Sequence, residues 1–252
     1  MRDTMRRAGM LAALLSALTL FPSLAHAQEG PPKEEGTFLK PDLVELKKFD
    51  ETFKLDVRYA TANNFAGRAV YKEARAFLQR PAAEALVRAS RSLREKGYGL
   101  AVFDAYRPWF VTKLFWDITP EDKKQFVANP SKGSRHNRGC AVDLTLYDLK
   151  TGREVEMTGD YDEMSERSHI AYAGGTEEQQ RLRDLLRAAM EAEGFTVYEP
   201  EWWHYDYKDW RQYPILNLGF DEIGKAARPR SARTSRRRSR PPTTNRARAA
   251  AS

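Results

Sequence analysis

The sequence predicts a mixed domain of short strands and helices, a pattern compatible with the α+β class. Residues 140–147 alternate apolar and polar side chains, which is typical of a strand with one buried face. Residues 99–104 form a short apolar run between turn signals, as a buried strand does. Residues 176–193 instead place apolar side chains at helical spacing. Strands and helices therefore follow one another within one stretch of chain, with no internal repeat.

The other elements follow from the same signals. The helix predicted over residues 176–193 opens with a capping box formed by Thr176 and Gln179 and stops before a glycine. The predicted helices cover residues 81–96, 109–117, 119–129 and 176–193. The predicted strands cover residues 55–60, 99–104, 140–147, 195–198 and 201–207, with a hairpin return at 154–157.

Length and composition predict one domain of ordinary size. The chain has 252 residues, of which 41% are hydrophobic and 31% charged, enough for a substantial core. We expect the domain over residues 38–224, after a polar linker over residues 28–37. Residues 225–252 hold no large apolar side chain, so we expect a disordered Arg-rich tail there.

Residues 1–27 have the pattern of a secretory signal peptide. Three arginines precede an apolar run over residues 10–21, and a small-x-small site ends at Ala27. The apolar run is shorter than the roughly 20 residues that span a membrane. We therefore expect cleavage after Ala27, no transmembrane segment in the remaining chain, and a periplasmic or secreted protein.

The basic net charge of +7 belongs to the two ends of the chain. Residues 1–27 carry three Arg and one Asp, and residues 226–252 carry nine Arg and no acid, which leaves −4 for the segment between them. A mildly acidic body gives no reason to expect a specific nucleic-acid partner. For the tail, contact with anionic polymers and an extension of no specific function remain equal alternatives.

Cys140 is the single cysteine, so neither an intramolecular disulfide nor a zinc finger can form. It lies within an alternating strand pattern. A lone cysteine in that position is more often a small core residue than a nucleophile.

Two separate segments carry candidate metal ligands. His136 and Asp143 flank a Gly139 turn at the start of a strand, and His204 follows a Glu-Trp-Trp run near the end of the domain. Two imidazoles and one carboxylate match a catalytic zinc site, which takes three protein ligands and a water. The residues alone leave an equal alternative, in which these side chains only hydrogen-bond to one another.

Glu201 and Arg107 are candidates for catalysis beside that metal. Glu201 precedes His204 by three residues, so in a regular strand the two would point to opposite faces. If the backbone bends after Pro200, Glu201 can reach the metal site and take a proton from water. Arg107 follows a buried strand and could meet an oxyanion with two donors. Its alternative is a surface arginine in a salt bridge.

At this point the chain resembles a known family. The motif Ser134-x-His136-x-x-Gly139-x-Ala141-x-Asp143, taken with Glu-Trp-Trp-His at 201–204, is similar to the zinc D-alanyl-D-alanine dipeptidases of the vancomycin-resistance (VanX) type. These belong to the zinc DD-peptidase superfamily, which also includes DD-carboxypeptidases. The resemblance extends over residues 58–65, 97–99, 104–108, 144–147 and 162–169.

The resemblance implies a fold and a role for each candidate residue. The fold would be a small antiparallel sheet with packed helices, the zinc DD-peptidase (Hedgehog-like) fold. One Zn²⁺ per chain would be held by His136, Asp143 and His204. Glu201 would be the general base and Arg107 would stabilise the transition state. The residues expected to bind substrate are Asp162 and Tyr59, at the free ammonium, and Ser134, near the other end.

The activity implied is hydrolysis of the D-Ala-D-Ala dipeptide, in the turnover of cell-wall peptides. A DD-carboxypeptidase acting on longer peptidoglycan peptides is the alternative enzyme. A wall-binding protein with a structural zinc is the alternative from another class. Arg135 departs from the family, which often has Ser beside the first ligand.

Overall fold

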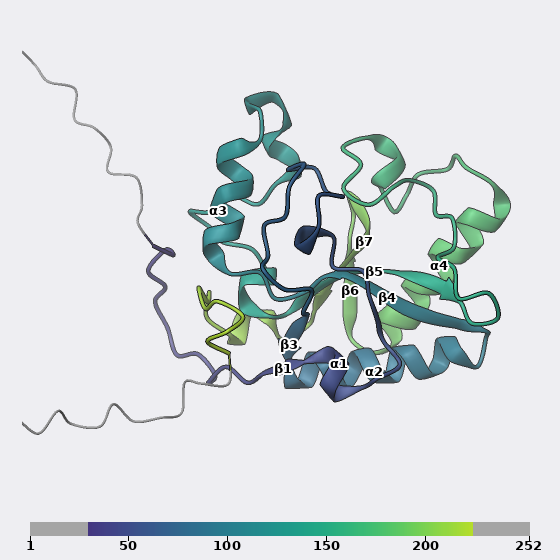
Figure 1. Cartoon of the computed structure of the whole chain (residues 1–252), viewed down its shortest axis with the longest axis horizontal. Helices are drawn as coiled ribbons and strands as arrows, with labels where there is room; N and C mark the ends of the chain where they lie inside the picture. The colour runs from purple at the N-terminus through teal and green to yellow at the C-terminus, as the bar shows by residue number, and fades with distance from the viewer. Residues whose placement is uncertain (1–29, 224–252) are drawn as a thin grey trace, which may run out of the picture.

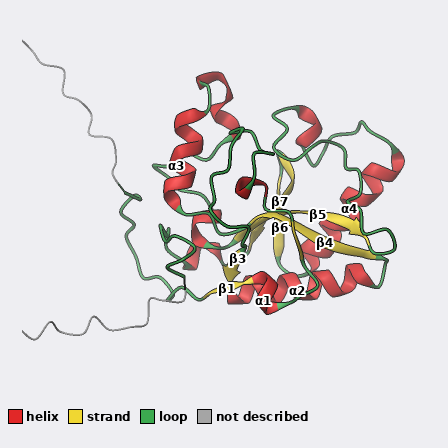
Figure 2. Cartoon of the chain, in the orientation of Figure 1, coloured by secondary structure: helices red, strands yellow, loops and turns green. Residues whose placement is uncertain are grey.

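A computed structural model describes residues 30–223 of the chain. The strands are β1 (Leu43–Glu45), β2 (Lys54–Leu55), β3 (Phe77–Gln79), β4 (Tyr98–Asp104), β5 (Ala141–Asp148), β6 (Phe195–Tyr198) and β7 (Glu201–Tyr207). The helices are α1 (Leu46–Phe49), α2 (Arg80–Arg94), α3 (Trp109–Ile118) and α4 (Glu177–Ala192). Figure 2 shows strands at the centre and helices around them, which confirms the α+β class.

The centre of the fold is a five-stranded sheet with the order β2-β4-β5-β7-β6. Figure 1 shows the labels of β4, β5, β6 and β7 together at the centre of the molecule. Neighbouring strands from β4 to β6 are antiparallel, as predicted, whereas the short edge strand β2 runs parallel to β4. β1 and β3 form a separate antiparallel pair. The pairing of β5 with β7 places the start of β5 beside the middle and end of β7.

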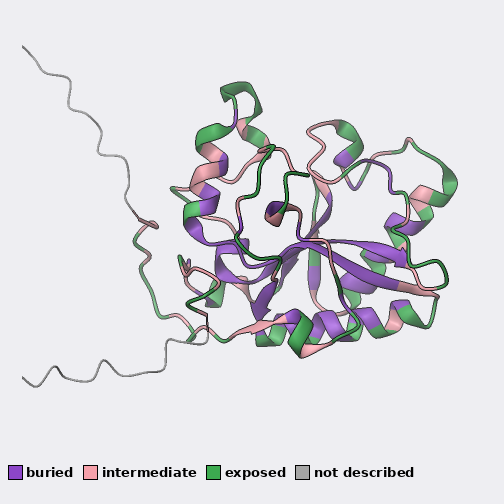
Figure 3. Ribbon diagram, in the orientation of Figure 1, coloured by how far each residue is buried: buried purple, intermediate pink, exposed green. Residues whose placement is uncertain are grey.

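Helices α2 and α4 pack on one face of this sheet and form the main core with it (Figure 1). Val142, Leu144 and Leu146 of β5 point into that core, as their alternation predicts. Cys140 is also buried there, which confirms its structural assignment. In Figure 3 the central strands are almost entirely buried. Because successive side chains of a strand point to opposite faces, Asp143 and Thr145 lie on the face of the sheet away from this core.

A smaller apolar cluster covers part of the opposite side. It joins Val57 and Tyr59 to Val111 and Phe115 of α3. This cluster forms one wall of the cavity that contains the candidate site. The second layer thus leaves the sheet partly uncovered, and the polar side chains of β5 and β7 face the opening.

Three predicted elements are wrong in extent. The hairpin return expected at 154–157 is reduced to a single bridge between Tyr147 and Glu154. Residues 56–60 do not continue a strand, since β2 ends at Leu55 and Arg58–Ala60 forms a 3₁₀ turn. The carbonyl of Tyr59 accepts hydrogen bonds from the next loop instead of from a strand. The helix expected from Thr119 is a 3₁₀ segment, Glu121–Phe126. Thr119 does not cap it, because its hydroxyl donates back to the Phe115 carbonyl at 2.7 Å.

The predicted signal peptide (residues 1–27) and the predicted tail (residues 225–252) both lie outside the described residues, so both stay predictions. Within the predicted linker, Glu34 forms an ion pair with Arg138 and accepts a hydrogen bond from the Ile215 amide at 2.6 Å. That part of the linker therefore lies against the domain. Among residues 30–223, no helix combines the length and the apolar character that crossing a membrane requires.

Candidate metal centre and active site

The three predicted ligands meet because of sheet register. Asp143 of β5 and His204 of β7 are direct cross-strand partners, so their side chains lie beside each other. His136 sits on a 3₁₀ turn immediately before β5. Gly139 closes this turn with φ 67°, a left-handed conformation that favours glycine. The turn brings His136 back over the strand that carries Asp143.

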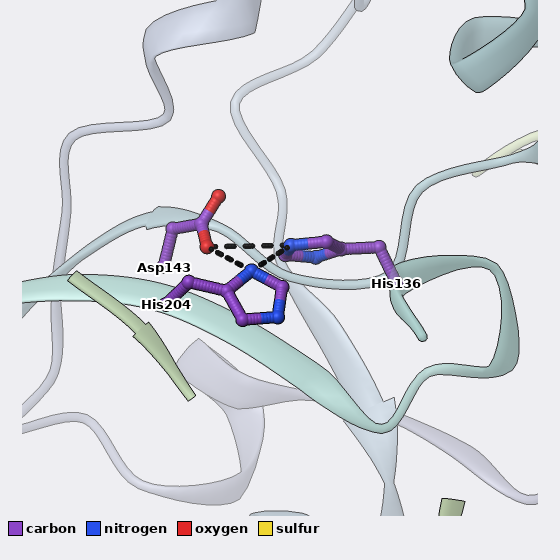
Figure 4. Close-up of side chains that lie close together, drawn as sticks. All are labelled: His136, Asp143 and His204. Carbon is purple, nitrogen blue, oxygen red and sulfur yellow. Dashed lines mark hydrogen bonds and ion pairs between the residues drawn. The ribbon is translucent and has the colours of Figure 1, made fainter. Parts of the chain in front are cut away.

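The ligand atoms form a compact triangle (Figure 4). His136 Nε2 lies 3.1 Å from His204 Nδ1, and Asp143 Oδ1 lies 3.3 Å and 3.1 Å from these two nitrogens. In a tetrahedral zinc site with bonds of about 2.0 Å, neighbouring ligand atoms are roughly 3.3 Å apart. The three side chains are therefore spaced as one metal ion requires, and all three are buried.

Hydrogen bonds on the outer side of each imidazole set its tautomer. His136 Nδ1 is 2.7 Å from the Ala105 carbonyl oxygen, which can only accept, so Nδ1 carries the proton. His204 Nε2 is 2.8 Å from Asp206 Oδ1 and is the donor by the same argument. The two nitrogens that face the triangle, His136 Nε2 and His204 Nδ1, then each present a lone pair. Such outer contacts orient metal-binding histidines in proteins.

Asp143 supplies the decisive observation. Its Oδ2 accepts a hydrogen bond from Tyr161 at 3.0 Å, but its buried Oδ1 has no hydrogen-bond donor among the described residues. Oδ1 instead faces two imidazole lone pairs. A buried carboxylate oxygen without a hydrogen-bond donor lowers the stability of the fold unless a cation beside it compensates its negative charge. The donor set of two nitrogens and one oxygen therefore fits a divalent metal such as zinc.

Glu201 reaches the site because strand β7 is irregular. The β6–β7 register shifts between Val197 and Tyr198, so residues between Glu201 and Tyr205 are not matched one to one. Glu201 Oε2 consequently lies 3.6 Å from His204 Nδ1. Burial raises the pKa of Glu201 to about 7, with Asp143 adding to the rise and His204 opposing it. A carboxyl group with that pKa is suited to exchange protons near neutral pH.

Arg107 is buried rather than a surface arginine. Its Nη2 and Nε both bond Asp104 Oδ2, at 2.8 Å and 2.9 Å. Its guanidinium lies over the rings of Tyr59 and Phe115 and 3.8 Å from Asp143 Oδ2. These contacts fix a positive charge in the wall of the cavity beside the three ligands. A fixed, partly desolvated donor is what stabilisation of an oxyanion needs.

Asp162 and Tyr59 face the cavity together. The Tyr59 hydroxyl lies 2.9 Å and 3.1 Å from the two oxygens of Asp162. Asp162 has φ 61°, a strained conformation for a residue other than glycine. Burial, together with the charge of Asp143, raises the pKa of Asp162 well above its ordinary value. A carboxylate held in this way gains most from a cationic partner.

Ser134 also lines the cavity, which has a volume of about 350 Å³. Its hydroxyl oxygen accepts a hydrogen bond from the His136 amide at 3.2 Å, so it also supports the turn that holds the first ligand. All eight predicted site residues thus border one cavity: Tyr59, Arg107, Ser134, His136, Asp143, Asp162, Glu201 and His204.

Sequence reasoning missed three residues that support the site. Asp206 could have been found, because it lies two positions after His204 and so shares its face of the strand. Asp104 belongs to a motif noted for Arg107, but no role was assigned to it. Tyr161 had no signal, since only the packing of the loop brings its hydroxyl to Asp143.

The chain is similar to several known proteins. The family model for D-ala-D-ala dipeptidase (Peptidase_M15) matches residues 40–217. The D-alanyl-D-alanine dipeptidase of Escherichia coli (strain K12) is 36% identical over 175 residues, which cover 69% of this chain and 89% of that protein. The enzyme of the same name from Enterococcus faecium is 40% identical over 184 residues, covering 66% and 90%. Among solved structures, the LdcB LD-carboxypeptidase matches 52% of this chain and 59% of its own, with a TM-score of 0.37 and 23% identity.

Proposed function

The chain belongs to the D-Ala-D-Ala dipeptidase family, peptidase family M15, and from this membership and the site we propose that it is a zinc-dependent dipeptidase. Its substrate is the D-alanyl-D-alanine dipeptide, the compound in the names of its relatives. The observation that carries the proposal is the unpaired Oδ1 of Asp143, set between two imidazole lone pairs with Glu201 beside them.

Each group around the cavity has a task in peptide hydrolysis. One zinc ion would be held by His136, Asp143 and His204, and when bound it would supply Lewis acidity and make water more acidic. Glu201 accepts the proton of the attacking water and delivers it to the leaving amine. Arg107, fixed by Asp104, faces the negative charge that develops on the carbonyl oxygen.

Asp162 favours a dipeptide over a longer peptide. A dipeptide presents a free ammonium group next to the bond that is cleaved, whereas an acyl-capped or longer substrate does not. Tyr59 holds the Asp162 carboxylate at the cavity wall, where an ammonium would compensate its buried charge. The DD-carboxypeptidase alternative has no use for this acid.

The test is release of D-alanine from the dipeptide by the purified protein. We expect turnover that a chelator abolishes and added zinc restores. Glu201→Ala should lower kcat by at least a hundredfold while zinc binding persists, since general acid–base catalysis contributes about 10²–10⁴-fold. The free dipeptide should be preferred over its N-acetyl derivative. A protein that binds zinc and leaves the dipeptide intact contradicts the proposal, and a preference for the acetylated substrate supports the carboxypeptidase.

For the cellular setting we propose export and a role in turnover of cell-wall peptides. The support is the signal-like pattern of residues 1–27 and the chemistry of the substrate. The nine arginines of residues 226–252 suit contact with anionic polymers outside the catalytic domain.

A further inference from the structure

The cavity is electrostatically polarised across the three ligands. Asp162 follows Tyr161, whose hydroxyl donates to Asp143, so this acid lies on the Asp143 side of the three ligands. Arg135 lies on the other side, beyond His204, and is reached through Asp206. An acid and a base therefore border the cavity that contains the candidate metal centre, the acid near Asp143 and the base near His204.

Contacts with neighbouring side chains hold the Arg135 guanidinium in place and leave some of its N–H donors available for a ligand. Its Nε lies 3.3 Å from Asp206 Oδ2, and its guanidinium stacks near the rings of Trp210 (5.0 Å) and Tyr198 (5.9 Å). Its side chain is 39% exposed, and within residues 30–223 its two terminal nitrogens make no hydrogen bond. Stacking on aromatic rings and one ion pair fix the plane of the group and leave its outer edge available.

The other cations of the cavity are less suited to bind an anion from the substrate. Two nitrogens of Arg107 already bond to Asp104, and its side chain is buried. Lys132 lines the cavity but is exposed, so solvent competes for its ammonium. Arg135 alone among these three combines a fixed guanidinium plane with free donors, the geometry that binds a carboxylate with two parallel hydrogen bonds.

A dipeptide carries opposite charges at its two ends. Two extended residues span roughly 7 Å, with the peptide bond between the ammonium and the carboxylate. With the ammonium at Asp162, the carboxylate needs a cation elsewhere on the cavity wall, and Arg135 provides one.

We propose that Arg135 is a specificity-determining residue that binds the free C-terminal carboxylate of the substrate, opposite Asp162. This inference rests on the proposed function and adds the residue that requires a free carboxyl end. In consequence, the enzyme recognises a zwitterion from both ends, and a substrate whose carboxylate is neutralised loses one of the two contacts.

The experiment compares D-alanyl-D-alanine with D-alanyl-D-alaninamide, in which the carboxylate is a neutral amide. The wild-type protein should prefer the dipeptide about tenfold to a hundredfold in kcat/KM, the value of a charge-assisted hydrogen bond, with the difference mainly in KM. Arg135→Ala should reduce this preference to within about twofold, and Arg135→Lys should give an intermediate value because it keeps the charge and loses the fork.

Three variants serve as controls. Arg211→Ala removes a guanidinium that stacks on the same Trp210 at 4.1 Å but does not border the cavity, so the preference should persist. Lys132→Ala tests the rival cation and should also leave the preference intact. Asp162→Asn is the mirror case: it should abolish the preference for the free dipeptide over its N-acetyl form and retain discrimination against the amide.

A binding measurement separates recognition from catalysis. In the zinc-loaded Glu201→Ala background, calorimetry should show tighter binding of dipeptide than of amide, and Arg135→Ala should remove that difference without changing zinc content. If Arg135 only supports Asp206, both ligands weaken equally and zinc affinity falls, which overturns the proposal. An unchanged preference in Arg135→Ala, or its loss in Lys132→Ala, also overturns it. A wild-type protein inactive on the dipeptide instead refutes the proposed function.

Discussion

At the scale of single residues, the site depends on the atoms of the ligands that face away from the metal. Each ligand has such an atom engaged: His136 Nδ1 by the Ala105 carbonyl, His204 Nε2 by Asp206, and Asp143 Oδ2 by Tyr161. These contacts leave one free electron pair per ligand pointing to a common centre. The chemistry of the site is therefore set by neighbours that do not touch the metal.

Replacement of Asp206 should test this statement. Asp206→Ala removes the acceptor for His204 Nε2–H, so the imidazole can rotate or change tautomer, and zinc affinity should fall about 10- to 100-fold. Competition with a chelator of known affinity measures the change. Asp206→Asn keeps a carbonyl acceptor for the imidazole, so its zinc affinity should fall less than that of Asp206→Ala.

Asp209→Ala is the matched control, because Asp209 accepts from Gln212 in the turn after β7 and leaves the imidazole contacts intact. Equal zinc affinity in Asp206→Ala and the wild-type protein would mean that packing alone orients His204.

At the scale of elements, irregular backbone brings the catalytic groups to one face. A regular β7 would separate Glu201 from His204, and the register shift opposite β6 removes that conflict. The β4–β5 register also shifts, between Val102 and Asp104, and aligns Asp104 with Asp143. Bulges are frequent beside active sites because they redirect side chains. Here the two shifts place Asp104, the partner of Arg107, and Glu201, the proposed general base, next to the three candidate ligands.

The Gly139 turn gives a quantitative test at this scale. A Cβ at Gly139 would lie 2.4 Å from Leu43 Cδ2 and 3.4 Å from the Gln79 amide nitrogen, whereas at Gly152 it would meet only Lys54 Nζ at 3.5 Å. Both glycines have similar φ, 67° and 70°, so alanine costs each about 1–2 kcal/mol in backbone strain.

Gly139→Ala should therefore destabilise the protein by about 1 kcal/mol more than Gly152→Ala, which serves as the control for backbone strain. Urea unfolding of the two variants measures the difference in free energy. Equal losses would show that the loop around Leu43 relaxes without cost.

At the scale of the whole molecule, the three ligands link parts of the chain that are distant in sequence. His136 and Asp143 come from one segment, and His204 comes from β7, after α4 and β6. In the unfolded chain these groups are far apart, so a metal binds the native state in preference. Zinc should therefore stabilise the fold as well as serve the reaction.

We expect thermal unfolding to report this linkage. Free zinc at 100 times its dissociation constant should add about 2.7 kcal/mol of stability, so a chelator should lower Tm. The variant His204→Ala should unfold at a temperature that no longer depends on zinc. An identical Tm for the wild-type protein with and without chelator would argue against a metal bound to the native state.

Much of this architecture follows from local pattern. The alternation of β5, the apolar run of β4 and the capping box of α4 each describe a segment whose preferences agree with its surroundings. The strand expected at 55–60 failed because its alternation fits an edge strand, and the edge here pairs over only two residues. Sequence periodicity reports which side chains can be buried, but not which partner strand is present.

The sequence by itself determined which groups are available for chemistry: two histidines, one aspartate, one glutamate and one arginine, in motifs of an M15 peptidase. Tertiary structure decided how they act. Only the folded sheet sets Asp143 opposite His204, bends β7 at Glu201, and adds Asp206, Tyr161 and Arg135. The reason is physical: residue types are local properties, whereas ligand distances and unpaired acceptors arise from strand register and from loops packed across the sheet.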